Sequence, residues 1–234
     1  MRKNKKRVLL FDIDGTLVDP QGEGHTCMRL ALQDVFGTAG PIETYDMSGK
    51  TDWQIVTELM QLAGLEAHKI KTQRQAAFRA YAWVVAREAP NLVMDVLPGV
   101  PALLNQLAGD ERFLLGLLTG NVREAVPHKL RAAGLNPDIF QFGAYGSEHI
   151  DRNELPPLAL ERAGRLFDTK VSPEAALIIG DTPRDIACAR NGGLKVLSVA
   201  TGWFSKEELA VHNPDYLLDD LGDLDLVMGI LSAF

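Results

Sequence analysis

Two kinds of hydrophobic pattern divide this chain: short unbroken apolar runs, and longer stretches in which apolar residues recur with helical spacing. The first apolar run covers 8–11 and stops at two carboxylates, Asp12 and Asp14. A strand with one exposed face would carry polar residues throughout. An unbroken run is instead typical of a central parallel strand that is covered on both faces.

Similar apolar runs recur in the second half of the chain, at 113–119, 139–145, 176–181 and 195–201, with a short edge strand expected at 216–219. Helical patterns lie between them, at 100–108, 123–134, 154–167 and 184–193. Strands that alternate with helices predict a parallel sheet with right-handed crossovers. The fold class is therefore α/β, with a Rossmann-like core.

The stretch 20–97 shows helical spacing only. Its periodic segments are 25–37, 51–64 and 66–89. We predict an α/β core made of 1–19 and 98–234, interrupted directly after its first strand by a helical domain at 20–97. Such an insert leaves the core intact, and one that overhangs the strand ends can act as a lid.

The composition of the chain limits the classes of molecule that it is expected to bind. With 46% hydrophobic residues the 234-residue chain can bury a large core, and its net charge of −7 argues against a nucleic-acid-binding face. No apolar segment approaches the roughly 20 residues of a membrane span, and the basic residues at 2–7 are typical of a solubilising terminus. Cys27 and Cys188 lack metal-like spacing. We expect a cytoplasmic monomer or homodimer that acts on a small molecule, without binding nucleic acid or membrane.

Polar residues follow the predicted strands at the points where the strands end. Thr119, Gly120 and Asn121 follow one strand, Asp181 and Asp185 follow another, and Arg152 stands alone before a helix. Carboxyl ends of parallel strands meet at one edge of a sheet, so these groups should converge with Asp12 and Asp14. Carboxylates this close repel one another, and a hard cation such as Mg²⁺ relieves the repulsion. A phosphate could be held by the threonine, backbone amides and the arginine, so the pattern favours phosphoryl transfer.

The motifs DIDGTLVD at 12–19, TGN at 119–121 and GDTPRD at 180–185, with a lone cation before a helix, resemble the haloacid dehalogenase superfamily. The resemblance runs from Val8 to about Thr201 and is nearest to its helical-cap phosphatases of the phosphoglycolate phosphatase type. It implies a Mg²⁺-dependent phosphatase that hydrolyses a small phosphorylated metabolite, a phosphomonoester, through an aspartyl-phosphate intermediate. Phosphoglycolate, a sugar phosphate and a nucleotide all remain candidate substrates.

The resemblance also implies roles for single residues. Asp12 is the nucleophile, and Asp14 protonates the leaving alcohol and then activates water. Thr119 binds the phosphate with help from the backbone of Gly120 and Asn121. Asp12, the backbone carbonyl of Asp14, and Asp181 hold Mg²⁺. Asp185 lies behind these ligands or reaches the metal through a water molecule.

One motif departs from the family, which usually has a lysine where this chain has no suitable one. Arg152 is the candidate substitute because it keeps the positive charge, and Lys170 is a distant alternative. The segment 48–52 is a candidate to contact the substrate, although Thr51 or Asp52 could equally serve as a helix N-cap.

Two other reactions fit part of the pattern. A phosphomutase of the β-phosphoglucomutase type would keep the paired aspartates and the metal but return the phosphate to a sugar. A metal-independent 2-haloacid dehalogenase would attack carbon with its aspartate. Asp14 argues against the dehalogenase, because an acid placed to protonate an alkoxide has no use in halide displacement.

Overall fold

The computed structural model describes residues 6–168 and 170–234, so most of the basic N-terminal run, at 2–5, lies outside the described residues. In the described part, a six-stranded sheet has the order β5-β4-β1-β6-β7-β8, and every pairing is parallel. Its strands are β1 (Arg7–Phe11), β4 (Phe113–Thr119), β5 (Phe142–Tyr145), β6 (Ala176–Gly180), β7 (Lys195–Val199) and β8 (Tyr216–Leu218). The predicted α/β fold class is confirmed.

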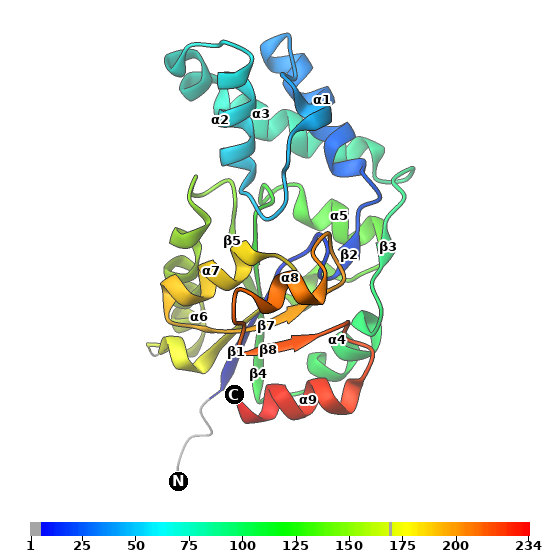
Figure 1. The fold of residues 1–234 in the computed structure, drawn as a ribbon, viewed down its shortest axis with the longest axis vertical. Helices are drawn as coiled ribbons and strands as arrows, with labels where there is room; N and C mark the ends of the chain where they lie inside the picture. The colour runs from blue at the N-terminus through cyan, green and yellow to red at the C-terminus, as the bar shows by residue number, and fades with distance from the viewer. Residues whose placement is uncertain (1–5, 169) are drawn as a thin grey trace.

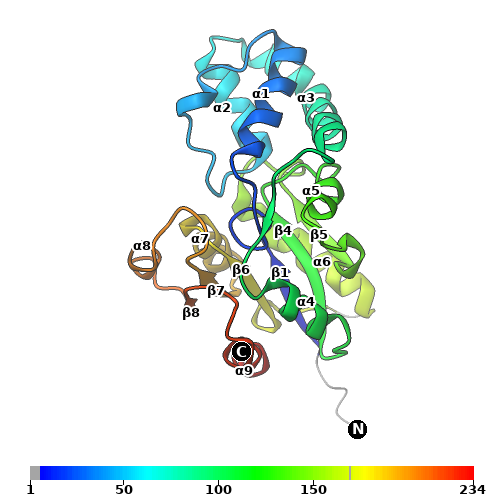
Figure 2. The same cartoon turned by 90° about the vertical axis from the view of Figure 1, so that its right-hand side faces the viewer.

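Helices cover both faces of the sheet (Figure 2). They are α4 (Val100–Ala108), α5 (Val126–Ala132), α6 (Leu155–Phe167), α7 (Pro183–Gly192), α8 (Lys206–Ala210) and α9 (Leu224–Ala233). Leu9 and Phe11 of β1 belong to a hydrophobic cluster with α4, α5 and α9, whereas Val8 and Leu10 belong to one with α6, α7 and α8. Because both faces of β1 are buried, its sequence has no polar alternation.

Three helices form the helical insert, which stands over the carboxyl ends of the strands (Figure 1). They are α1 (Glu23–Phe36), α2 (Asp52–Leu62) and α3 (Ala67–Glu88). The insert has its own hydrophobic cluster, which includes Leu32, Leu59 and Phe78 and also takes in Val122 from the sheet part. A two-stranded antiparallel ribbon, β2 (Val18–Asp19) with β3 (Asp95–Val96), joins the two parts.

The structure shortens four of the predicted strands and adds elements that the sequence pattern did not indicate. β6, β7 and β8 end one or two residues before the predicted strands do. The strand expected over 139–145 begins only at Phe142, because Pro137–Ile139 forms a 3₁₀ turn closed by the Phe140 amide on the Pro137 carbonyl, at 3.1 Å. The ribbon, α8 and α9 were not predicted. The 3₁₀ turn at Pro137–Ile139 is η2, and the other 3₁₀ turns of the described residues are η1 (Ile42–Thr44), η3 (Arg152–Glu154) and η4 (Pro173–Ala175).

Both cysteines are buried and unpaired, Cys27 in the insert and Cys188 on α7. Each therefore packs as a small hydrophobic residue. Among the described helices, none combines the length and the apolar character needed to cross a bilayer.

Candidate active site

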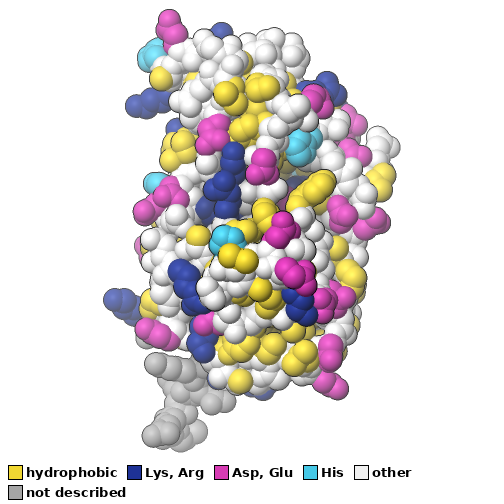
Figure 3. All heavy atoms as spheres, viewed as in Figure 1, with side chains coloured by type: hydrophobic (Ala, Val, Ile, Leu, Met, Phe, Trp, Pro, Cys, Tyr) yellow, Lys and Arg dark blue, Asp and Glu magenta, His cyan; other side chains and the backbone are white. Residues whose placement is uncertain are grey.

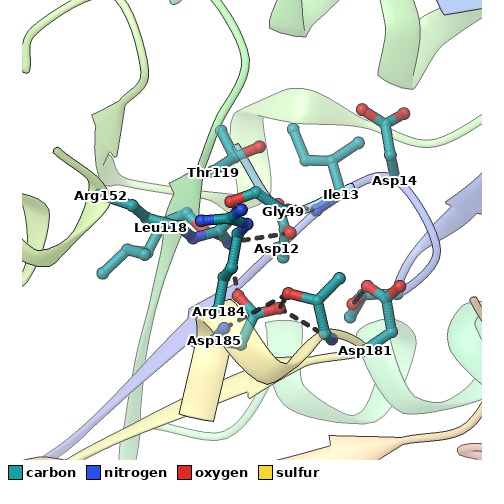
Figure 4. Close-up of polar contacts among 12 residues, drawn as sticks. Asp12, Ile13, Asp14, Gly49, Leu118, Thr119, Arg152, Asp181, Arg184 and Asp185 are labelled. Carbon is teal, nitrogen blue, oxygen red and sulfur yellow. Dashed lines mark hydrogen bonds and ion pairs between the residues drawn. The ribbon is translucent and has the colours of Figure 1, made fainter. Parts of the chain in front are cut away.

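Asp12 is the first residue after β1, at the centre of the sheet between β4 and β6. The residue is 4% exposed, and both carboxylate oxygens accept a hydrogen bond. Oδ1 accepts from the Ile13 amide at 2.7 Å, and Oδ2 accepts from Nη2 of Arg152 at 2.9 Å (Figure 4). From β1 the chain builds the sheet outward on one side through β4 and β5 and then on the other side through β6, β7 and β8. Ligands bind in open α/β sheets at the point where the strand order reverses in this way. A carboxylate is thus held in one orientation at the expected ligand position.

Arg152 lies on η3 and is 5% exposed. Besides Asp12, its Nη2 pairs with the carboxylate of Asp185, and its Nη1 donates to the Gly49 carbonyl of the insert at 3.0 Å. Burial alone would lower the pKa of Arg152, but the Asp12 and Asp185 carboxylates raise it above its usual value. The arginine therefore keeps its charge beside Asp12, whereas Lys170 is exposed.

Three buried carboxylates gather beside this pair. Asp12, Asp181 and Asp185 each offer an oxygen, and these oxygens lie within 4.8 Å of one another. Burial raises the pKa of Asp181 well above its usual value, and the Asp185 and Asp12 carboxylates raise it further. Burial likewise raises the pKa of Asp185, to about 6, although the charge of Arg152 opposes the rise. Three carboxylates facing one guanidinium leave an excess of negative charge.

The surroundings of Asp181 fit a cation site. Its Oδ1 accepts a hydrogen bond from Thr16 Oγ1 at 2.8 Å. Gly15 and Gly202 lie against its carboxylate so closely that a side-chain carbon at either position would collide with it. A donor set made only of oxygens, held in a tight cradle with excess negative charge, suits Mg²⁺. The residues present therefore fit Mg²⁺, the metal that the sequence implied. Asp185 offers an oxygen to the same cluster as Asp12 and Asp181, the two side chains that were expected to be ligands.

The loop after β4 lies below the insert. Thr119 is fully buried, and its Oγ1 accepts from the amide and the side-chain nitrogen of Asn121 at 3.3 and 2.9 Å. The Gly120 carbonyl accepts from the Asp52 amide at 2.7 Å, and a side chain at Gly120 would collide with the Lys50 carbonyl. The close approach of the two backbones explains the glycine at this position.

Asp14 points away from Asp12 and Asp181 (Figure 4). Its oxygens accept from Nζ of Lys129 at 2.6 and 2.5 Å, and Oδ2 also accepts from Nδ2 of Asn121 at 2.8 Å. Sequence reasoning missed Lys129. The available signal was its place on the apolar side of the predicted helix, three residues after Val126 and one before Leu130, where a lysine needs a buried partner.

The segment 48–52 of the insert both starts α2 and docks on the sheet part. Thr51 is the N-cap of α2, and its hydroxyl also donates to the Ile150 carbonyl at 2.8 Å. Asp52 accepts from the Val122 amide at 2.6 Å. Thr51 is therefore the N-cap of the two candidates. The Asp52 carboxylate instead binds the loop after β4, next to the candidate phosphate-binding residues 119–121.

A cleft of about 820 Å³ lies between the insert and the sheet part. Hydrophobic, acidic and basic side chains meet along this boundary in the space-filling view (Figure 3). The lining includes Asp12, Asp14, Arg152 and Asp181 from below and the segment 46–50 from above. This size suits a small ligand. Lys170 is not among the described residues that line it.

Comparisons with known proteins identify the family of this chain. The family model described as "Haloacid dehalogenase-like hydrolase" matches residues 9–199. A protein of Synechococcus elongatus named phosphoglycolate phosphatase is 27% identical over 218 residues, which cover 93% of this chain and 95% of that protein. A Bacillus mycoides protein named pyrophosphatase PpaX is 30% identical over 230 residues, covering 94% and 95%.

A solved structure, CbbY from Rhodobacter sphaeroides in complex with phosphate, has the same fold. Its TM-score is 0.69 at 21% identity, covering 94% of this chain and 96% of that one. The matched region of the family model extends from β1 to β7 and includes every motif of the cleft. The chain therefore belongs to the haloacid dehalogenase-like hydrolase family.

Proposed function

We propose that this protein is a Mg²⁺-dependent phosphatase that hydrolyses a small phosphomonoester through an aspartyl-phosphate on Asp12. The observation that carries the proposal is the arrangement around Asp12, which is buried between the Arg152 guanidinium and two further carboxylates. Asp14 is two residues further along the chain and lines the same cleft. A nucleophile, an acid/base group and an anion-compensating cation thus meet in one small space.

Asp12, Asp181 and the backbone carbonyl of Asp14 would hold the metal, and Asp185 would support them directly or through water. When bound, Mg²⁺ offsets the negative charges of the carboxylates and the phosphate and holds a phosphate oxygen in place. Arg152 contributes a second positive charge next to Asp12. The Thr119 hydroxyl has no acceptor among the described residues and can donate to the phosphate.

The reaction has two displacements. In the first, an oxygen of Asp12 attacks phosphorus, the ester P–O bond breaks, and Asp14 gives its proton to the leaving alkoxide. In the second, Asp14 takes a proton from water, the water oxygen attacks phosphorus, and Asp12 is released as its carboxylate. Both steps need Asp14 close to the oxygen that gains or loses the proton, on the cleft side of Asp12.

Phosphoglycolate, a phosphomonoester, is the first candidate substrate. Pyrophosphate, a phosphoanhydride whose leaving group is phosphate rather than an alkoxide, is the second, since relatives carry names for both activities. Both leave a product that carries negative charge. Lys50 is the one lysine or arginine that the insert contributes to the described cleft lining, and its Nζ lies 2.8 Å from the Tyr45 hydroxyl and 3.0 Å from Glu58. It can pair with an anionic leaving group from the insert side of the cleft.

We assign 1–19 and 98–234 to the catalytic part and 20–97 to the cap that covers it.

The test is phosphate release from a panel of phosphorylated metabolites, with and without Mg²⁺. We expect hydrolysis of small phosphate esters that EDTA abolishes and Mg²⁺ restores. Asp181→Ala should remove activity or raise the Mg²⁺ concentration it requires. Hydrolysis that persists unchanged in EDTA would contradict the proposal. A sugar phosphate that is isomerised without net phosphate release would assign the chain to the phosphomutase reaction instead.

A further inference from the structure

Lys129 is a buried lysine whose ammonium group has a complete set of partners. The residue is 2% exposed, on α5. Nζ lies 2.6 and 2.5 Å from the two oxygens of Asp14 and 2.7 Å from Oδ1 of Asn121. An ammonium has three protons to donate, and three acceptor oxygens surround it.

Such a placement is costly unless it is compensated, because an ammonium removed from water loses several kcal/mol of hydration. The neighbours of Lys129 on α5, Val126 and Leu130, are buried apolar residues. A hydrophobic residue would fill the same space without a charge. The presence of a lysine here therefore suggests that its partners, Asp14 and Asn121, need a hydrogen-bond donor at this position.

Its main partner needs a fixed orientation. The Asp14 side chain is 34% exposed and faces the cleft, so solvent competes for its oxygens. Asn121 donates only to Oδ2, and among the described residues Oδ1 has Lys129 alone as a donor. Without the lysine, one amide hydrogen bond would be left to hold the carboxylate in place.

We propose that Lys129 is a positioning residue for the acid/base group, holding the Asp14 carboxylate at the cleft wall in the orientation that both proton transfers need. The inference rests on the proposed function, in which Asp14 protonates the leaving oxygen and then activates water. Lys129 acts through Asp14. Asn121 joins this pair to the loop after β4, so the acid/base group and the phosphate-binding loop share one hydrogen-bonded frame.

The first test measures how strongly the rate depends on the leaving group in Lys129→Met. Alkyl phosphates need a proton donor to leave, whereas nitrophenyl phosphates leave without one. Because misplacing a catalytic group by about 1 Å costs roughly 10²-fold, we expect kcat for alkyl phosphates to fall by about that factor. The first turnover with nitrophenyl phosphate should change by less than about 3-fold, since general acid help adds little there. An equal loss on both classes would overturn the inference.

The second test is a double-mutant cycle with Asp14→Asn. If Lys129 acts through Asp14, adding Lys129→Met to Asp14→Asn should change kcat very little. If Lys129 only stabilises the fold, its effect should be the same in both backgrounds, and that result would overturn the inference. Arg131→Met, an exposed position on the same helix, is the matched control and should behave like the unaltered protein.

Lys129→Arg covers the case in which the methionine variant fails to fold. It keeps a cation beside Asp14 but moves the donors, so it should show the same selective loss on alkyl phosphates with a smaller loss of thermal stability. Failure of the proposed function is distinguishable: it would appear as loss of phosphatase activity, or of its dependence on Asp12, in the unaltered protein. If those hold and the substitutions at Lys129 lack leaving-group selectivity, only the positioning role is wrong.

Discussion

At the scale of single residues, Arg152 is the residue that we propose in place of the lysine expected from the resemblance. Its two terminal nitrogens have different tasks: Nη2 pairs with Asp12 and Asp185, and Nη1 reaches the Gly49 carbonyl of the insert. A lysine presents a single nitrogen and cannot span both sites in this way. The guanidinium therefore links the candidate nucleophile to the helical insert as well as supplying charge.

Substitutions of Arg152 should separate these two tasks. Arg152→Ala should lower kcat/KM by about 10²–10³-fold, the range typical of losing one preorganised charge-stabilising donor. Arg152→Lys should recover much of kcat because the charge returns, while KM stays raised because the contact with Gly49 is lost. Steady-state kinetics with saturating Mg²⁺ would measure both. A near-wild-type Arg152→Ala enzyme would show that the charge beside Asp12 is dispensable.

Some of the site residues could be predicted from their place at the ends of strands. Asp12 and Asp181 directly follow β1 and β6, and Thr119 is the last residue of β4. Strand ends converge in any parallel sheet, so the proximity of these three residues follows from the pattern. Lys129 could not be predicted in the same way. It lies inside a helix, and its contact with Asp14 depends on how α5 packs against the end of β1, which local spacing does not encode.

At the scale of elements, the start of α2 is the contact that ties the insert to the sheet part. Asp52 is buried there and accepts a hydrogen bond from the Val122 amide at 2.6 Å. Burial raises its pKa from 3.8 to about 7; Lys129 and the Val122 amide oppose this rise and Asp14 adds to it. The first turn of α2 thus carries a carboxyl that holds its proton more tightly in the folded state than in the unfolded chain.

This raised pKa predicts a pH-dependent stability. Between 3.8 and about 7 the folded protein keeps a proton that the unfolded chain has lost, so this group's contribution to stability falls as pH rises. Asp52→Asn keeps an acceptor for Val122 but cannot ionise. Because each pKa unit is worth about 1.4 kcal/mol, the variant should be more stable than the unaltered protein by a few kcal/mol near pH 8. The gap should close toward pH 4.

Thermal unfolding curves of both proteins across this pH range would measure the gap. Thr51→Ser is a suitable control, because it keeps the cap hydroxyl and introduces no ionisable group. A stability difference between Asp52→Asn and the unaltered protein that stays constant with pH would contradict a raised pKa at Asp52.

Elements with a strong pattern were predicted well, and weak ones were not. The strand over 113–119 matches β4, whose burial on both faces gives an unbroken apolar run. The helix over 100–108 matches α4, whose single buried face gives apolar residues at helical spacing. β2 and β3 have two residues each, too few to show any period. α9 was missed although Asp223 caps it by accepting from the Leu226 amide at 3.0 Å.

At the scale of the whole molecule, the sheet part has a hydrophobic cluster on each face of the sheet and the helical insert has its own, and the cleft lies between the two parts. The sheet part supplies Asp12, Arg152 and Asp181 to the cleft. The helical insert, joined to the sheet part by the β2–β3 ribbon, stands over them (Figure 1). The segment 48–52 donates hydrogen bonds to the carbonyls of Gly120 and Ile150, and its Gly49 carbonyl accepts one from Arg152. The candidate catalytic groups are therefore covered on the insert side, and under the proposed function this favours small substrates and limits access of water.

Phosphoryl transfer to Asp12 is the central step of the proposed function. The most direct measurement is a rapid acid quench of the Asp14→Asn variant with Mg²⁺ and a radiolabelled nitrophenyl phosphate, followed by peptide mapping. Because Asp14→Asn keeps the nucleophile but hydrolyses the intermediate slowly, we predict about one phosphoryl group per chain, on the peptide that contains Asp12. Release of nitrophenol together with free phosphate and no label on Asp12, in the first turnover, would contradict the account.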